Sequence, residues 1–330
     1  MNTNIIIKKC IEIPGISLKN NPTNIELCME QDDGRGSMTF FSIFPGISIA
    51  YIFINSPTWP IPNLPDQDDS SNRPLLLNYC VTGRCELFLD NNSFVYLKNG
   101  EFSISKKSAQ KQYAYPLRIY EGLEFFIEID TISALAPYIN DVFNINVDKI
   151  TDLYSLLDKT YISQCSKDLK HILTKIWALY DEDAAHAIFM MKVYTLQLLE
   201  LLLCRKHIPQ PKSLTFFTAT QVEIAQKTER IITADLKQHH PAWKIAKLFS
   251  ISETSLKNYF RGIYGQNISV YLREVRMNEA AKMLEITKMP ISKISEQVGY
   301  MNQSKFASVF RLQYNMSPLE YRRKKVLKDI

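Results

Sequence analysis

Two stretches near the C-terminus carry the same pattern of residues. Residues 245–265 read IAKLFSISETSLKNYFRGIYG, and residues 291–323 read ISKISEQVGYMNQSKFASVFRLQYNMSPLEYRR. Matching positions lie 49 residues apart and, after one additional residue, 50 apart, so that Phe260 recurs as Phe310. Caps, apolar positions and a basic residue all repeat, whereas chance amphipathicity would preserve only the apolar spacing. The sequence therefore indicates an internal duplication.

Each copy predicts two short helices joined by a tight turn. In the first copy, Ile245 lies in the first helix, the turn falls at residues 249–251, and Ser252 caps a second helix that carries Leu256 and Phe260. Inward-facing apolar residues on two helices around a tight turn are typical of the helix-turn-helix motif. The duplication therefore predicts two such motifs in tandem.

A longer helix over about residues 269–286 is predicted to join the two copies, with Leu272, Val275, Ala280, Met283 and Leu284 facing inward. At 1.5 Å per residue, roughly 18 residues span about 27 Å, which can hold two recognition helices near the ~34 Å separation of successive major grooves. Upstream, Thr220 and Glu223 predict a capping box that opens a further helix.

The net charge of +5 hides an asymmetry between the two parts of the chain. Residues 1–218 hold 20 Lys and Arg against 24 Asp and Glu, a net charge of −4, whereas residues 219–330 hold 19 against 10, a net charge of +9. A basic segment of this kind indicates a nucleic acid or another anionic partner. With 46% hydrophobic and 22% charged residues, the chain as a whole has an ordinary globular composition.

The N-terminal part of the chain predicts a β-domain followed by helices. Residues 40–130 contain many short β-branched and aromatic runs separated by turn residues, which favours a barrel or sandwich. Because no strand carries His-x-His, we expect a cupin-like barrel without a metal. Residues 151–204 change to a helical period and predict two amphipathic helices. Either both pack on the barrel, or one of them forms a dimer interface. Trp59, Tyr79, Tyr113 and Tyr115 either line a ligand pocket or belong to the core.

The expected fold class is therefore α+β, in three segments. We expect a cupin-like regulatory domain at residues 1–150, a helical connector and possible dimerisation region at residues 151–217, and an all-α DNA-binding domain at residues 218–330. Six scattered cysteines predict reduced thiols rather than a disulfide framework. With no secretory signal pattern and with charged residues in its most apolar stretch, the chain is expected to be cytoplasmic and not membrane-bound.

The repeated stretches, together with YLREVRMNEAAKML between them, resemble the DNA-binding domain of the AraC/XylS family of bacterial transcription regulators. The likeness covers about the last 110 residues, and SLKNYFRGIYG and YLREVRMNEAA also resemble the siderophore-responsive, PchR-like subgroup. The resemblance implies promoter DNA, RNA polymerase, a small-molecule effector and a second copy of the chain as partners. It also implies activation rather than repression, and neither a cofactor nor an enzymatic activity.

Helical geometry separates the inward and outward faces of the two predicted recognition helices, and the outward residues near each N-terminus are in place to reach base edges. The resemblance supports as base readers Thr254, Lys257 and Asn258 in the first helix and Gln303, Ser304 and Ser308 in the second, with Lys305 on the same outward face. Arg261 and Arg311, a turn farther along, are expected to contact phosphates or pair within the domain. Ser250 and Asn315 stand where the family often has glycine.

Two alternative functions combine the same DNA-binding domain with an enzyme. A metal-dependent cupin enzyme would need histidine ligands, but no histidine precedes residue 151. A DNA-repair methyltransferase would need an activated thiol, and Cys80 and Cys85 have only Arg84 nearby in the sequence. The sequence therefore favours a regulator that senses a ligand and binds DNA.

Overall fold

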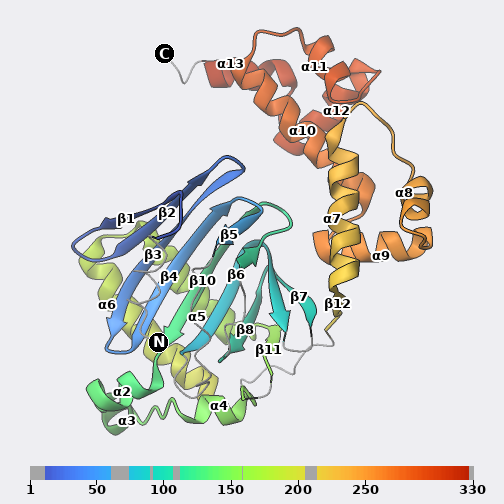
Figure 1. The fold of residues 1–330 in the computed structure, drawn as a ribbon. Coiled ribbons are helices and arrows are strands. Elements are labelled where there is room, and N and C mark those ends of the chain that lie inside the picture. The colour runs from blue at the N-terminus through green and yellow to red at the C-terminus, as the bar shows by residue number, and fades with distance from the viewer. Residues whose placement is uncertain are drawn as a thin grey trace. The chain divides into compact units, whose positions relative to one another are not determined.

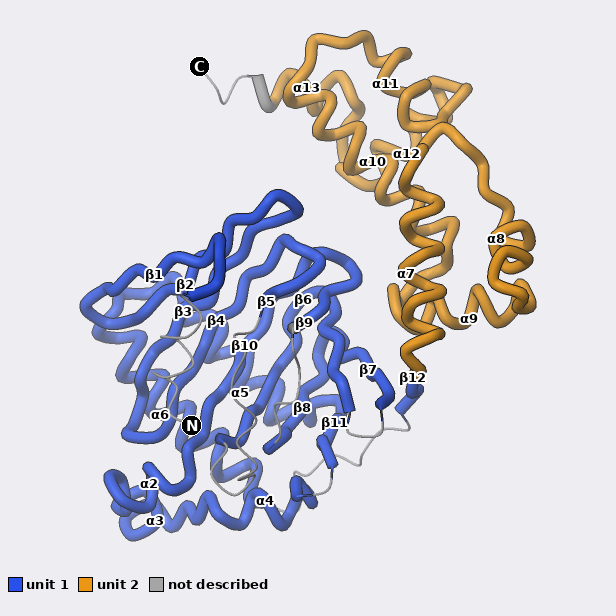
Figure 2. The backbone as a smooth tube through the Cα atoms, viewed as in Figure 1, with its two compact units in different colours: residues 1–216 blue, residues 217–330 orange. Residues whose placement is uncertain are grey.

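The structure is a computed structural model that describes residues 12–60, 74–89, 92–106, 112–157, 159–204 and 214–326. The chain forms two compact units, residues 1–216 and residues 217–330, which Figure 2 shows in separate colours. The first unit is built on a large antiparallel sheet, and the second is almost wholly helical (Figure 1). The expected α+β class is confirmed.

An antiparallel sheet forms the centre of the first unit. Its strands are β1 (Ile16–Asn20), β2 (Ile25–Gln31), β3 (Gly34–Phe44), β4 (Ile47–Asn55), β6 (Leu75–Leu89), β7 (Ser93–Lys98), β8 (Glu101–Ser105), β10 (Ile119–Ile127) and β11 (Tyr161–Gln164). The order is β1-β2-β3-β4-β10-β6, and the long β6 pairs with β8 along its first half and with β7 along its second. Two short strands, β5 (Thr58–Pro60) and β9 (Gln112–Ala114), pair with each other.

Both faces of the central strands are buried. In β4, Ile49 and Tyr51 belong to one hydrophobic core, whereas Ala50 and Ile52 belong to a second, because successive side chains of a strand point to opposite faces. The second core includes residues of β1, at one end of the sheet, and of β7, beyond β6. The sheet therefore curls around this core, as expected of a barrel-like domain, while its cupin-like character stays a prediction.

Helices cover the other face of the sheet. They are α2 (Ile129–Leu135), α3 (Tyr138–Phe143), α4 (Lys149–Leu153), α5 (Lys167–Ala178), the short 3-10 helix η2 (Leu179–Asp181) and α6 (Ala184–Leu203). Leu173 of α5 and Met191 and Leu198 of α6 are fully buried in the first core with strand residues. The two predicted connector helices therefore pack on the sheet as part of the first unit, and a dimer role for either stays a prediction.

Among the described helices, α6 alone is long and apolar enough to cross a membrane by length and composition. Its apolar side chains Met191, Leu198, Leu199 and Leu202 pack against the sheet, each at most 2% exposed. Because one face of α6 packs on the sheet, its length and apolar composition are only weak evidence for a membrane span.

The second unit begins with β12 (Phe217–Thr218) and continues with helices. They are α7 (Ala219–Ala234), α8 (Ala242–Leu248), α9 (Glu253–Tyr264), α10 (Ile268–Ile286), α11 (Ile291–Gln297), α12 (Gln303–Tyr314) and α13 (Pro318–Val326). The predicted capping box of Thr220 and Glu223 is wrong: Thr218 caps α7 and Gln221 closes the box. The helix begins earlier because Thr218 has the extended backbone of an N-cap and accepts a hydrogen bond from the Gln221 amide at 3.3 Å.

Candidate nucleic-acid interface

The two predicted helix-turn-helix motifs are present as α8–α9 and α11–α12. In both turns the same backbone bond closes the bend: the Ile251 amide donates to the Ala246 carbonyl at 3.1 Å, and the Tyr300 amide donates to the Ser295 carbonyl at 2.9 Å. The second helix then begins at a side-chain cap, Ser252 for α9 and Asn302 for α12. The repeat read from the sequence therefore corresponds to two copies of one local structure.

The core of each motif repeats the same aromatic cluster. In the first copy, the Phe260 and Tyr264 rings stack at 4.4 Å, and Tyr271 meets Phe260 edge-on at 5.4 Å. The second copy has corresponding distances of 4.6 and 5.4 Å. Its cluster consists of Phe310, Tyr314 and Tyr321. Aromatic pairs at these separations fix the angle between helices, so both recognition helices are held in the same way.

The long helix α10 belongs to both copies. Its Tyr271 completes the aromatic cluster of the first motif, and its Met277 and Leu284 lie in a core with Phe306 and Phe310 of the second. The predicted inward face of this helix was partly wrong: Tyr271, Met277 and Ala281 are buried, whereas Leu272, Val275 and Met283 are only half-buried. A helix that packs on opposite sides near its two ends does not show a single apolar stripe.

All nine residues predicted to touch DNA have exposed side chains. On α9 these are Thr254, Lys257, Asn258 and Arg261, and on α12 they are Gln303, Ser304, Lys305, Ser308 and Arg311. Two of them already have partners: Lys257 Nζ lies 2.5 Å from the Glu253 carboxylate, and the Ser308 hydroxyl donates to the Ser304 carbonyl at 3.0 Å. Each recognition helix thus presents a polar outward face opposite its aromatic core.

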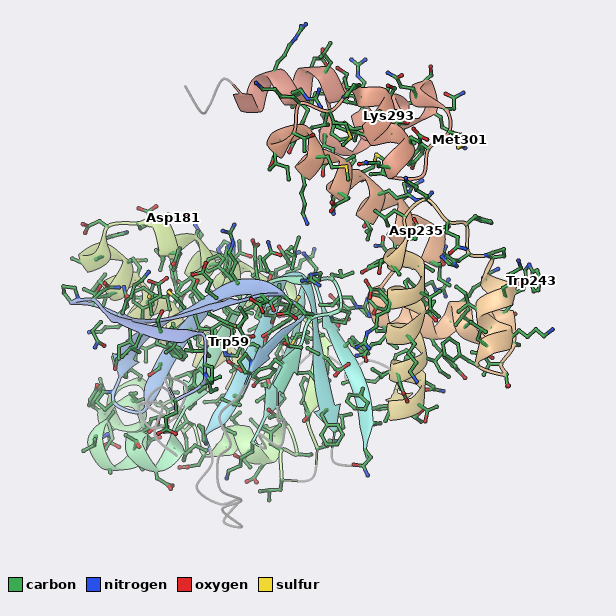
Figure 3. All side chains as sticks on the ribbon, turned by 45° about the horizontal axis from the view of Figure 1, so that its top comes forward. Trp59, Asp181, Asp235, Trp243, Lys293 and Met301 are labelled. Carbon is green, nitrogen blue, oxygen red and sulfur yellow. The ribbon has the colours of Figure 1, made fainter. Side chains whose placement is uncertain are left out.

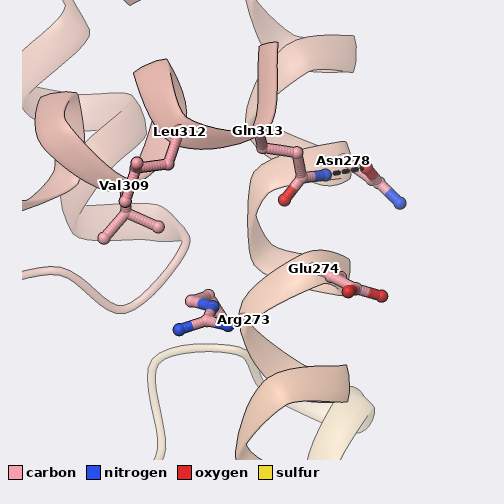
Figure 4. A pocket seen from close by; sticks show the side chains of 6 residues that line it. All are labelled: Arg273, Glu274, Asn278, Val309, Leu312 and Gln313. Atoms are coloured by element: carbon pink, nitrogen blue, oxygen red, sulfur yellow. Dashed lines mark hydrogen bonds between the residues drawn. The ribbon is translucent and has the colours of Figure 1, made fainter. Parts of the chain in front are cut away.

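Residues that the sequence analysis did not single out hold α12 in place. Asn278 of α10 accepts hydrogen bonds from the Gln313 side chain at 2.7 Å and from the Tyr314 hydroxyl at 2.9 Å. A surface groove of about 390 Å³ lies between α10 and α12 and is lined in part by Asn278 and Gln313. Figure 4 shows the side chains that line this groove and the bond from Gln313. Arg276 donates to the Leu236 carbonyl at 2.6 Å and lies over the Tyr300 ring. The bonded partners are 35 to 40 positions away in the printed sequence, so no local pattern indicates these hydrogen bonds.

Both departures from glycine lie at left-handed backbone positions. Ser250 and Gly299 occupy equivalent turn positions with φ of 56° and 83°, and Gly265 and Asn315 end α9 and α12 with φ of 81° and 56°. All four positions therefore have the left-handed conformation that glycine favours and asparagine tolerates. The first turn keeps its shape despite Ser250.

The ion pair at the start of α9 gives a testable expectation. Replacing Glu253 by glutamine should raise affinity for random-sequence DNA by roughly two- to fivefold at low salt, because it removes a negative charge from α9 and frees Lys257. Fluorescence anisotropy with a labelled random duplex at two salt concentrations measures this. The matched control is Glu223→Gln on α7, which breaks a similar pair with Lys227, 2.7 Å long. Equal gains in both variants would mean that only net charge is being sensed.

Comparison with known proteins agrees with the geometry. Residues 245–324 match a family described as a helix-turn-helix domain. The regulatory protein SoxS of Escherichia coli K12 is 36% identical over 78 residues, covering 24% of this chain and 73% of SoxS. The transcriptional activator RhaR of Escherichia coli O139:H28 is 33% identical over 98 residues, covering 30% of this chain and 35% of RhaR.

Among solved structures, the C-terminal domain of AraT, a response regulator from Geobacillus stearothermophilus, is 28% identical with a TM-score of 0.30. That match covers 31% of this chain and 84% of the AraT chain. The likeness to SoxS covers more than two thirds of that regulator. The chain therefore belongs to the AraC/XylS family of DNA-binding transcription regulators.

Proposed function

We propose that this regulator binds promoter DNA with α9 and α12 in successive major grooves and responds to a small molecule bound by its first unit. The observation that carries the DNA part is the duplication of the aromatic cluster behind two exposed polar helix faces. Through its 19 residues, α10 spans about 28 Å, which is compatible with the ~34 Å separation of successive major grooves.

The predicted residues divide into base readers and phosphate contacts. Gln303 and Asn258 have planar amides that can pair with adenine through two hydrogen bonds, and Thr254, Lys257, Ser304 and Ser308 complete the base-reading set. Arg261 and Arg311, and with them Lys305, are proposed to contact phosphates, and such contacts fix position without specifying sequence. Both arginines lie in the last turn of their helix, away from the N-terminus that enters the groove.

The first unit is the proposed sensor. Trp59, Tyr113 and Tyr115 pack together in or against its enclosed core, whereas Tyr79 lies in the core on the opposite face of the sheet, so the four aromatic residues do not line a single pocket. The proposed partners are a small effector, of siderophore type if the subgroup resemblance extends to ligand, a second copy of the chain, and RNA polymerase at activated promoters. An effector regulates only if it binds one arrangement of the units more tightly than another. A bacterial cytoplasm is the proposed location.

The chemistry of the thiols supports a regulator over the DNA-repair alternative. Burial raises the pKa of Cys80 to about 12 and holds that of Cys85 well above its usual range. A methyl-accepting thiol needs the opposite shift, toward the thiolate. For the cupin enzyme, no group of three or more His, Cys, Asp or Glu side chains able to hold a metal occurs within the described residues.

The test of the DNA assignment is the double variant Gln303→Ala/Ser308→Ala in the full chain. Its discrimination between a site selected from a random duplex pool and random DNA should fall roughly tenfold or more, since each good base contact contributes that order of selectivity. The control is Gln238→Ala/Ser269→Ala, which removes the same side-chain types from exposed positions outside α9 and α12. Unchanged discrimination in the α12 variant would refute the assignment of this helix.

A further inference from the structure

Met301 is the most exposed large apolar residue described, at 98% of its full accessible surface. It lies directly before Asn302, the cap of the second recognition helix, and Figure 3 labels it at the end of the turn. The first motif has no counterpart. There, the turn residue Ile251 is followed at once by the cap Ser252, whereas Met301 stands between the equivalent Tyr300 and Asn302. Met301 is therefore the additional residue that changes the repeat interval from 49 to 50.

The backbone on both sides of Met301 is held in place. Before it, Tyr300 is anchored by its amide bond to the Ser295 carbonyl at 2.9 Å, and its ring packs 5.8 Å from the Phe306 ring. After it, the Asn302 side chain accepts a hydrogen bond from the Lys305 amide at 2.9 Å. With both neighbours fixed, the insertion projects an apolar side chain into solvent from a turn that is already ordered. A partner that contacts Met301 would not have to order this backbone.

The surroundings of Met301 favour nucleic acid over protein as its partner. The residues that follow it, from Asn302 to Lys305, are all polar and exposed. A protein docking site would need a continuous apolar patch of several hundred Å². A single apolar side chain beside polar base readers matches the major groove, where the thymine C5 methyl is the apolar group on the base edges.

We propose that Met301 reads a thymine methyl in the major groove entered by α12. This inference rests on the proposed DNA contact of α12 and adds a specificity-determining residue to it. The proposed contact of Met301 also gives the two helix-turn-helix motifs different roles in reading DNA. The second reads one apolar feature of the DNA in addition to hydrogen-bonding edges, and the first has no residue at that place in its turn.

The experiment deletes the methyl from the DNA and the side chain from the protein. Binding of the full chain is measured on a duplex selected from a random pool, in which each thymine is replaced in turn by uracil, so that only the methyl is lost. For the wild type, replacing one particular thymine by uracil should weaken binding about fourfold, the factor expected for one buried methyl. This thymine should lie close to the base pairs at which Gln303→Ala relaxes the sequence preference. Met301→Ala should lose this sensitivity and keep the rest of the profile.

Three further variants separate the outcomes. Met301→Leu should keep the uracil sensitivity and Met301→Gln should lose it, because an apolar side chain is required. Leu248→Ala truncates another exposed apolar residue, 70% exposed on α8, and should leave the profile unchanged. A profile shared by wild type and Met301→Ala, or one with no sensitive thymine, overturns this inference. The proposed function stands in that case if Gln303→Ala/Ser308→Ala still loses discrimination, and both fail if the wild type selects no sequence.

Discussion

Replacing Glu124 by glutamine should stabilise the first unit by about 3 kcal/mol at pH 8 and by little at pH 4. Glu124 is 4% exposed on β10, and burial raises the pKa of its carboxyl from 4.5 to about 7 despite a hydrogen bond from Tyr113. The groups that face Glu124 are uncharged. Asn78 of β6 and Ala50 of β4 lie opposite it, and Tyr120 lies four residues away on the same face of β10. No cation in this set compensates the buried charge.

The direction of the pH dependence follows from the raised pKa. Well below pH 4.5 the carboxyl is neutral in both the folded and the unfolded chain, so this group contributes no difference. As the pH rises toward 7, the unfolded chain releases the proton while the folded chain keeps it, and the free energy of unfolding falls. Above pH 7 the full loss is present, and glutamine, which does not ionise, avoids it.

Urea unfolding of the full chain at pH 4, 6 and 8 measures the effect. In a Trp243→Phe background, tryptophan fluorescence reports only on the first unit, because the two remaining tryptophans, Trp59 and Trp177, both lie there. The pH 4 measurement is the internal control for any packing change caused by the amide. A stability difference between the wild type and the Glu124→Gln variant that stays constant from pH 4 to pH 8 would contradict a raised pKa.

A second large effect on stability is expected from a substitution in the turn between α11 and α12. Gly299→Ala should destabilise the second unit by about 3 kcal/mol, combining the cost of a left-handed alanine with overpacking. The φ of Gly299 is 83°, and an added Cβ would lie 2.2 Å from the Leu236 carbonyl oxygen and 2.8 Å from the Arg276 guanidinium. To make room, the 2.6 Å hydrogen bond between Arg276 and that carbonyl must break or shift.

The matched control is Ser250→Gly in the equivalent turn of the first motif. Ser250 has the same left-handed conformation, with φ of 56°, so glycine should relieve strain and stabilise the unit by up to about 1 kcal/mol. Chemical unfolding of the full chain, followed by circular dichroism of the helices, measures both variants. If Gly299→Ala cost no more than left-handed alanine alone, about 1–2 kcal/mol, the steric part of the argument would be wrong.

Much of the second unit could be predicted from the sequence because its structure is local. Ser252 and the apolar positions that predict α9 lie within a few turns of one another. The repeat predicts the same cap at Asn302 and the same apolar positions in α12, and the structure has both. The residue that caps a helix is harder to predict from sequence, since serine and threonine recur along the chain. The sequence predicts Thr220 as the cap of α7, and only the backbone conformation shows that Thr218 is the cap.

The contacts that could not be predicted join residues far apart in the chain. Asn278 looks like an ordinary exposed residue of α10 until α12 folds back on it, and Glu124 looks like a polar residue of a half-buried strand until the sheet curls. The nine predicted DNA contacts have exposed side chains, because helical geometry alone separates an inward from an outward face. Their roles on DNA stay predictions.

The shared helix α10 fixes the rotation of the second motif relative to the first, as well as the distance between them. Each residue of an α-helix turns the chain by about 100°, so one residue inserted between Tyr271 and Met277 would swing the whole second motif by that angle around the helix axis. Substitutions on the exposed side of α10 leave this phase intact, whereas any insertion or deletion changes it. The linkage between the two motifs can therefore vary in sequence while its residue count stays fixed.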